Sequence, residues 1–172
     1  MQSNGAGAAE ALVALRRIIR FLRLGDRDTE RAYGLSSAQL FALLAIDDSP
    51  AMSLAELAAR TMTDPSSVSA VVARLTRVGY IARVASTTDK RRAELTLTPA
   101  GKRLVRKAPR TPQAQLIAAI DGLPPARRAR LVAGLVDIVE AIGAEEMEPR
   151  LIFEPEPARS GSAAKRGKRS PA

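Results

Sequence analysis

The chain of 172 residues contains no cysteine and no histidine, and aromatic residues make up only 3 % of it. These two absences exclude disulfides, zinc fingers, cysteine nucleophiles and every mechanism in which imidazole is the catalytic base. No uncharged apolar stretch reaches the roughly 20 residues that span a bilayer. The first residues also lack the basic-then-apolar order of a signal peptide. The sequence therefore predicts a cytoplasmic protein that is not an enzyme, binds no metal or other cofactor and has no membrane partner.

Positive charge is in excess and is concentrated in one part of the chain. Lys and Arg number 27 against 18 Asp and Glu, which leaves a net charge of +9. Residues 64–110 contain eleven of the basic residues and three acidic ones, and so carry +8 of that charge. Such a balance favours a partner rich in negative charge, either nucleic acid or an anionic surface. Since hydrophobic residues make up 46 % of the chain, it can also build an aliphatic core.

The two ends of the chain differ in composition from its middle. Residues 1–8 are small and polar and are predicted to be a disordered lead. From Ala9 the apolar positions follow a helical period with arginines between them, and residues 25–28 are expected to interrupt that helix. Residues 146–172 are rich in Glu, Pro, Arg, Gly and Ser and are predicted to be mostly disordered. They include a basic cluster, Lys165, Arg166, Lys168 and Arg169, for which a solubilising role is favoured over a non-specific DNA anchor.

Residues 36–98 carry closely spaced start and stop signals. Ser36 and Ser53 are each followed three residues later by Gln or Glu, as in a capping box. Asp64 followed by Pro65 is a further helix start, because proline lacks the N–H that a first helical residue leaves unpaired. The helix that follows buries one apolar face, made by Val68, Val71, Val72 and Leu75. The period then changes to two over residues 81–97, which predicts a β-hairpin with a long polar tip.

The chain from Thr98 onward is predicted to be helical with breaks. Pro99 begins a basic helix, and Pro109 and Pro112 must end or kink it. The last helix has a narrow apolar seam, formed by Leu131, Leu135, Ile138 and Ile142. A helix that faces solvent does not need so many apolar residues along one face.

This order of elements is a winged helix-turn-helix within a mainly α fold that has a small β-hairpin wing. A helix fits the major groove of DNA, and a hairpin tip can reach the neighbouring minor groove. Short hydroxyls and cations on the longer helix and at the hairpin tip are candidate DNA contacts: Ser66, Ser67, Ser69, Arg74, Arg77, Lys90, Arg91 and Arg92. Serines also suit a first helical turn, and charged hairpin tips are common, but the fixed spacing between helix and tip favours DNA contact.

The sequence resembles the MarR family of bacterial transcriptional regulators over residues 10–143. The resemblance rests on the segment 64–75, on Val78-Gly79-Tyr80-Ile81, on Asp89-Lys90-Arg91, and on Leu97-Thr98-Pro99-Ala100-Gly101. It implies a homodimer that binds pseudo-palindromic double-stranded DNA, usually as a repressor, and is released by a small phenolic or anionic effector. The implied MarR-like domain is 9–145, with a winged helix-turn-helix at 36–98 and dimerisation helices at 9–33 and 99–143.

The resemblance also implies roles for individual residues. Arg91 matches the wing arginine that enters the minor groove, and Asp89 matches the acid that supports the wing, pairing with Arg74. The apolar positions of the dimerisation helices become a dimer interface: Leu12, Leu15, Ile19, Leu131, Leu135, Ile138 and Ile142. The effector pocket is not specified by the sequence, and Arg16, Arg20 and Phe41 are candidates by position alone.

The chain also departs from the family pattern. Ala70 and Ala73 stand where many members have polar or charged side chains, so direct base contacts are expected to be fewer. Two alternatives remain: a winged-helix module that binds protein, and a non-specific architectural DNA-binding module. An enzyme would need a carboxylate pair or an activated lysine, and the acidic residues cluster in loops and termini. Salt-dependent DNA affinity separates DNA binding from protein binding.

Overall fold

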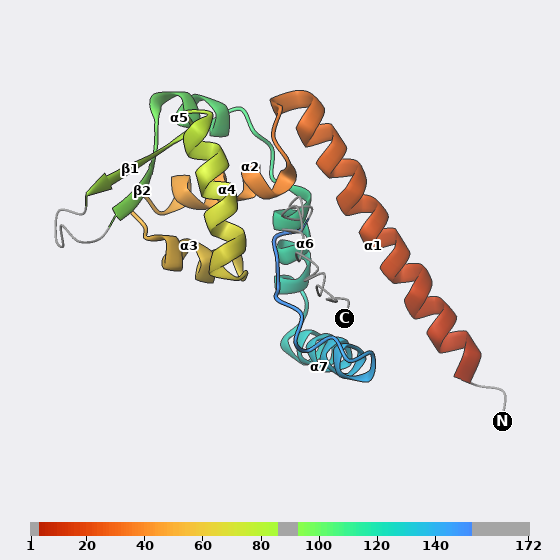
Figure 1. Ribbon diagram of the computed structural model, residues 1–172. Coiled ribbons are helices and arrows are strands. Elements are labelled where there is room, and N and C mark those ends of the chain that lie inside the picture. Colours follow the sequence, from red (N-terminus) through yellow and green to blue (C-terminus); the bar gives the residue numbers. More distant parts are fainter. Residues whose placement is uncertain (1–3, 86–92, 153–172) are drawn as a thin grey trace, which may run out of the picture.

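A computed structural model describes residues 4–85 and 93–152, with side chains from residue 7. Within these ranges the chain forms seven helices and one two-stranded antiparallel hairpin, the mainly α winged-helix architecture that the sequence predicts. We call α2, α3, α4 and the hairpin the reading head, and α1, α6 and α7 the arm helices. Figure 1 shows the reading head on one side and the arm helices projecting from it. No helix in the described part of the chain is long and apolar enough to cross a membrane.

The first helix, α1, is longer than the sequence suggests. It runs without interruption from Asn4 to Tyr33, so the prediction of a disordered lead is wrong for residues 4–8, and the break expected at 25–28 is absent. Gly25 lies where α6 packs on α1, because a Cβ at this position would be 2.1 Å from Cγ of Pro112. Asp26 accepts a hydrogen bond from the backbone N–H of Ser37 at 2.7 Å. These residues join α1 to its neighbours, and they do not break the helix.

The reading head begins with three helices whose N-termini are capped as predicted. They are α2 (Ser37–Asp48), α3 (Leu54–Thr61) and α4 (Pro65–Arg77). Complete capping boxes are present at Ser36 and Ser53, and Asp64 caps α4 with Pro65 as its first residue. The predicted buried face of α4 is confirmed, since its four apolar residues Val68, Val71, Val72 and Leu75 are all at most 4 % exposed.

The predicted hairpin is also confirmed. Strand β1 (Ile81–Ala85) pairs antiparallel with β2 (Ala93–Leu97), with Ile81 opposite Leu97. The alternation of β2 turns Leu95 and Leu97 into the core. The backbone N–H of Leu95 also donates to the carbonyl of Met52 at 2.8 Å, which ties the hairpin to the segment before α3. The hairpin tip, with Asp89, Lys90, Arg91 and Arg92, lies outside the described residues.

Three helices follow the hairpin: α5 (Pro99–Val105), α6 (Pro112–Asp121) and α7 (Pro125–Ala141). The prolines act as predicted, because the helix that begins at Pro99 ends at Val105 and a new one starts at Pro112. Thr111 caps α6 by accepting from the N–H of Ala114 at 3.2 Å. In contrast to the reading head, α7 has no buried residue within this chain.

The chain beyond α7 returns to the reading head, which corrects the prediction of disorder for residues 146–152. We call residues 149–152 the C-terminal strap. Leu151 is 2 % exposed and belongs to the same core cluster as Val68 and Val71 of α4. A single buried leucine in a Glu- and Pro-rich stretch has no periodicity, so the sequence pattern does not reveal it. Residues 153–172 lie outside the described residues.

Candidate nucleic-acid interface

The N-terminus of α4 is held by one carboxylate. Asp64 Oδ1 accepts from the backbone N–H of Ser67 at 2.9 Å and from the hydroxyl of Ser66. These bonds favour the charged form, so the Ser66 hydroxyl first and the Ser67 N–H second lower the pKa of Asp64. The result is an ordered first turn in the helix that a winged helix-turn-helix inserts into the major groove.

The outward face of α4 carries four of the eight hydroxyls and cations that the sequence selects. Ser66, Arg74 and Arg77 are exposed, and Ser69 is half-buried on the same face. Ala70 and Ala73 are exposed between them, so the middle of this face has no long side chain. The face therefore has short hydroxyls at its N-terminal end and two guanidinium groups toward its C-terminal end.

Ser67 does not belong to this face, and its assignment as a DNA contact is corrected. Its side chain is buried at 3 % exposure, on the side of α4 that meets the strap. Ser67 Oγ accepts a hydrogen bond from the backbone N–H of Leu151 at 3.3 Å. Ser67 therefore links α4 to the C-terminal part of the chain, and DNA cannot reach it in this arrangement.

Exposed positive charge lies on α4, on β1, on α5 and on the segment between α5 and α6. Within the described ranges, eight cations of residues 64–110 are exposed and none of them forms an ion pair: Arg74, Arg77, Arg83, Lys102, Arg103, Arg106, Lys107 and Arg110. Because no ion pair neutralises these charges, they add up to an excess of positive charge on this part of the chain.

The turn between α4 and β1 sets the angle between α4 and the hairpin. The motif Leu97-Thr98-Pro99-Ala100-Gly101 holds this turn in place by hydrogen bonds. Thr98 Oγ1 donates to the carbonyl of Gly79 at 2.7 Å and accepts from the N–H of Gly101 at 3.1 Å. The N–H of Thr98 donates to the carbonyl of Tyr80 at 3.0 Å. These bonds join the end of α4, the start of β1 and the start of α5 into one unit.

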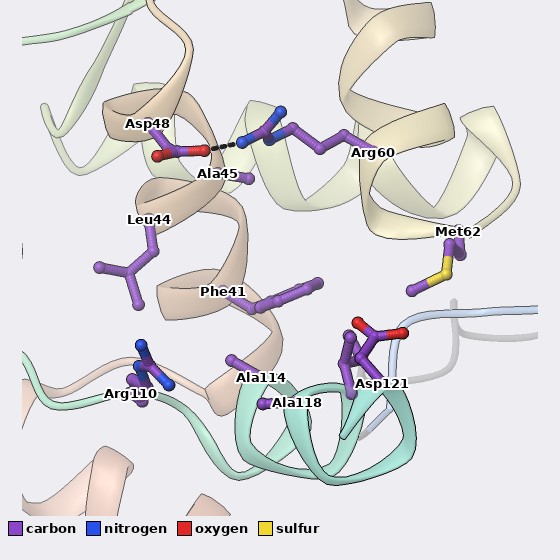
Figure 2. Close-up of a pocket in the computed structure, with 11 residues that line it drawn as sticks. Phe41, Leu44, Ala45, Asp48, Arg60, Met62, Arg110, Ala114, Ala118 and Asp121 are labelled. Atoms are coloured by element: carbon purple, nitrogen blue, oxygen red, sulfur yellow. Dashed lines mark ion pairs between the residues drawn. The ribbon is translucent and has the colours of Figure 1, made fainter. Parts of the chain in front are cut away.

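An open pocket of about 550 Å³ lies between the reading head and α6 (Figure 2). Phe41 and Leu44 of α2 face Ile117 and the alanines of α6 across it. Charged groups surround this apolar space: Asp48 and Arg60, which form an ion pair with each other, together with Arg110 and Asp121. Of the sequence candidates, Phe41 lines this pocket.

The other two candidates, Arg16 and Arg20, line a separate open groove on α1 with Arg23 and Arg27. The pocket between the reading head and α6 combines three segments far apart in the sequence, and no local sequence pattern predicts that they come together.

The apolar residues selected as a dimer interface are all exposed in the single chain. On α1 they are Leu12, Leu15 and Ile19, which are between 38 % and 48 % exposed. On α7 and at its C-cap they are Leu131, Leu135, Ile138 and Ile142, which are between 36 % and 70 % exposed. Exposed apolar side chains that follow one face of a helix are typical of an interaction site in a folded protein.

The cap at Asp64 gives a pH-dependent prediction. Replacing Asp64 with Ala should lower the free energy of unfolding at pH 7 by about 1 kcal/mol, because the N–H of Ser67 loses its acceptor. Since the folded pKa is lower than the value of 3.8 for the free group, the carboxylate stabilises the fold above that pH. This contribution is lost as the pH falls through the folded pKa. Urea unfolding at pH 7 and at pH 3 measures the difference.

The matched control is Asp64→Asn, which keeps an oxygen acceptor and removes the titrating group. Its stability should lie near that of the unaltered protein at pH 7. If the gap between the unaltered protein and Asp64→Ala stays constant down to the lowest pH at which both fold, the carboxylate is not the stabilising group.

The comparisons with known proteins agree with this geometry. A family model described as "MarR family" matches residues 33–92. BpsR of Bordetella bronchiseptica, whose DNA binding is regulated by 6-hydroxynicotinic acid, is 28 % identical with a TM-score of 0.52. That match covers 81 % of this chain and 96 % of BpsR. No curated protein matches the sequence.

Two further solved structures share the fold. FabT of Streptococcus pneumoniae, solved in complex with DNA, is 23 % identical with a TM-score of 0.51, covering 79 % of this chain and 95 % of FabT. The transcriptional regulator BldR of Sulfolobus solfataricus is 20 % identical with a TM-score of 0.52, covering 82 % of this chain and 99 % of BldR.

The fold is that of winged-helix regulators of transcription. The segment that the family model matches, residues 33–92, contains α2, α3, α4 and β1.

Proposed function

We propose that the protein is a homodimer that binds a pseudo-palindromic operator in double-stranded DNA and represses transcription until a small effector releases it. The observation that carries this proposal is the outward face of α4 together with the exposed cations of residues 64–110, none of which forms an ion pair within the described ranges. A repressor acts where the chromosome lies, so the proposal includes the cytoplasmic location expected from the sequence. It assigns no catalytic activity, cofactor or metal.

In the proposed complex, both ends of the outward face of α4 contact DNA. Ser66 and Ser69 are short enough to let the helix backbone approach base edges or phosphates, and Arg74 and Arg77 suit phosphates. Lys90, Arg91 and Arg92 of the hairpin tip would enter the adjacent minor groove, whose negative potential attracts arginine, with Asp89 as support. These roles of the tip rest on the sequence.

In the proposed dimer, the exposed apolar residues of α1 and α7 form the interface between the two copies. No residue of α7 is buried within its own chain. Such a helix needs a partner that removes its apolar surface from water. A second copy of this chain would supply an identical surface, and two-fold symmetry is the usual arrangement in soluble oligomers. The same symmetry would place two α4 helices on two half-sites of the operator.

The proposed effector binds in the pocket between α2 and α6. Its apolar walls suit a flat ring, and Arg110 at its edge suits a phenolic or anionic group. A ligand there would contact both the reading head and an arm helix and could favour one relative position of the two. The regulation of BpsR by 6-hydroxynicotinic acid supports a small acidic effector.

One observation favours a second candidate function, a non-specific architectural DNA-binding module. Ala70 and Ala73 leave the middle of the outward face of α4 without a long polar side chain. Such a protein would bind all duplexes nearly equally, with a steep dependence on salt. A protein-binding winged helix would instead show no salt-dependent affinity for DNA.

The variant Arg91→Ala tests the proposed role of the wing. We expect operator affinity to fall about 10- to 100-fold, or about 1–3 kcal/mol, while the dimer stays folded, because the minor groove loses one cation. Fluorescence anisotropy with an operator duplex measures the change. Arg127→Ala, at the start of α7, removes the same charge away from the reading head and should leave affinity unchanged. Equal affinity of Arg91→Ala and the unaltered protein would remove the wing from the mechanism.

A further inference from the structure

The C-terminal strap ties the end of the described chain to α4. The carbonyl of Pro149 accepts from the backbone N–H of Asp64 at 3.1 Å, and the N–H of Leu151 donates to Ser67 Oγ at 3.3 Å. The side chain of Leu151 is 2 % exposed and belongs to the core cluster of the reading head. Asp64 is the N-cap of α4, and Ser67 lies in its first turn. One end of the strap is therefore fixed to the N-terminal end of α4.

The other end of the strap lies where the arm helices meet the reading head. Ile152 is half-buried and lines a small cavity together with Leu22 of α1, Ser37 of α2, and Pro112 and Gln113 of α6. Figure 1 shows the blue end of the chain passing from α7 along α6 toward this region. Within four residues, the strap therefore joins the helix that is proposed to read DNA to two of the arm helices.

Without the strap, the arm helices meet the reading head at a compact junction. Ser37, the first residue of α2, donates hydrogen bonds to Asp26 and Thr29 of α1. Pro112, the first residue of α6, packs against Gly25 of α1. Beyond this junction, the open pocket of about 550 Å³ separates α2 and α3 from α6. Because side chains do not fill that space, the junction can act as a hinge between the reading head and the arm helices.

The strap adds a second attachment across this hinge. Asp64, to which Pro149 is bonded, comes two residues after Met62, which lines the open pocket. A stretch of four residues can span at most about 14 Å, so α4 cannot move far from α1 and α6 while both ends of the strap are held. A segment that served only to bury Leu151 would need no contact with the arm helices.

We infer that the strap is a brace that fixes the angle between α4 and the arm helices, and thereby sets the half-site separation that the dimer accepts. This inference rests on the proposed function, in which the arm helices form the dimer and each α4 reads one half-site. One extra base pair between the half-sites moves one of them by about 3.4 Å and rotates it by about 35°. A dimer whose heads are held at one angle cannot follow such a change. Pro149, Leu151 and Ile152 are positioning residues, and they do not touch DNA.

The first test measures the position of α4 relative to α1 without DNA. Because the chain has no cysteine, Arg17→Cys on α1 and Ala73→Cys on α4 provide two specific sites for spin labels, and both positions are exposed. Double electron–electron resonance measures the distance between the labels, in an excess of unlabelled protein so that each dimer carries one labelled chain. We expect a single narrow distribution. Leu151→Ala and Ile152→Ala each loosen one end of the brace and should at least about double its width.

Two controls separate the brace from general stability. Leu97→Ala removes a buried side chain from the same core cluster, but Leu97 pairs with Ile81, beyond the C-terminal end of α4. Met147→Ala alters the segment before the strap at a side chain that is 74 % exposed. Both controls should keep the narrow distribution. If the strap variants also keep it, or if Leu97→Ala broadens it as much as they do, the inference is overturned while the proposed function stands.

The second test measures the half-site separation that the dimer accepts. A duplex from the intergenic region upstream of the protein's own gene, with its half-sites located by footprinting, is compared with duplexes that have one base pair added or removed between them. The unaltered protein should lose about tenfold or more in affinity on either change, because the duplex must deform to meet both heads. For Leu151→Ala and Ile152→Ala the loss should shrink to about threefold or less, because the heads can follow the half-sites.

A strap that only stabilised the fold would lower the affinity for all three duplexes by the same factor. If the strap variants keep the tenfold preference of the unaltered protein, the strap does not set the separation and the inference is overturned. If the unaltered protein binds none of the duplexes, the proposed function fails and the half-site role of the strap fails with it. The label distances are measured without DNA, so they distinguish that failure from the failure of the brace itself.

Discussion

A chain that carries Leu135→Asp should be a monomer in light scattering while it keeps the helix content and unfolding midpoint of a folded monomer. Leu135 is 48 % exposed in the single chain and α7 has no buried residue there, so the carboxylate costs the monomer little. In the proposed dimer, two carboxylates would be removed from water without partners, at a cost of several kcal/mol. The dissociation constant of the dimer should rise at least about a thousandfold. Operator affinity should fall with it, because two half-sites are no longer bound together.

The matched control is Val136→Asp. Val136 has the same exposed fraction, 48 %, and lies about one third of a helical turn away from the seam residues. This variant should remain a dimer and bind the operator. If Leu135→Asp remains a dimer at micromolar concentration, the seam on α7 is not the interface.

Gly101→Ala should lower the free energy of unfolding by about 3 kcal/mol, a large part of the total stability of a domain of this size. A Cβ on Gly101 would lie 2.3 Å from the carbonyl oxygen of Tyr80, and this oxygen already accepts from the N–H of Thr98. Because the obstructing atom belongs to the backbone, the start of α5 must move away from the turn after α4. Urea unfolding followed by circular dichroism measures the loss.

Gly7→Ala is the control for this substitution. A Cβ on Gly7 has no neighbour within 4 Å, and Gly7 lies within α1, so alanine should leave stability unchanged or raise it slightly. Equal stability of Gly101→Ala and the unaltered protein would mean that the contact with Tyr80 is not tight. DNA affinity should also fall in Gly101→Ala, since the same unit sets the angle between α4 and the hairpin.

Local chemistry makes the reading head predictable from the sequence. Each capping signal, at Ser36, Ser53 and Asp64, involves residues three positions apart, and each forms the expected bond. The inward face of α4 follows from a spacing of three and four residues, and the hairpin follows from a change of period. These features need no knowledge of distant contacts.

Contacts between distant segments explain where the sequence misleads. Gly25 and Asp26 have the composition of a helix break, but they lie within α1 because Pro112 and Ser37 pack there. Ser67 has the composition of a DNA contact, but Leu151, 84 residues further along the chain, covers it. Tertiary packing decides such positions.

The same reasoning applies to the candidate site. Phe41 could be proposed from its position, but its pocket partners on α3 and α6 become neighbours only when the arm helices fold against the reading head. The roles of Asp89, Lys90, Arg91 and Arg92 rest on spacing and on the family resemblance, and they remain predictions. Four arginines of α1 line a groove of their own, separate from the pocket: Arg16, Arg20, Arg23 and Arg27. They lie close together because they follow one face of a single helix.

Sequence-specific DNA binding is the central claim, and one titration tests it most directly. A fluorescent duplex from the intergenic region upstream of the protein's own gene is titrated against a scrambled duplex of the same length across a salt series. We expect the intergenic duplex to bind at least about a thousandfold more tightly, with a stoichiometry of one dimer per site. Equal, steeply salt-dependent binding to both duplexes, or no binding to either, would contradict the claim.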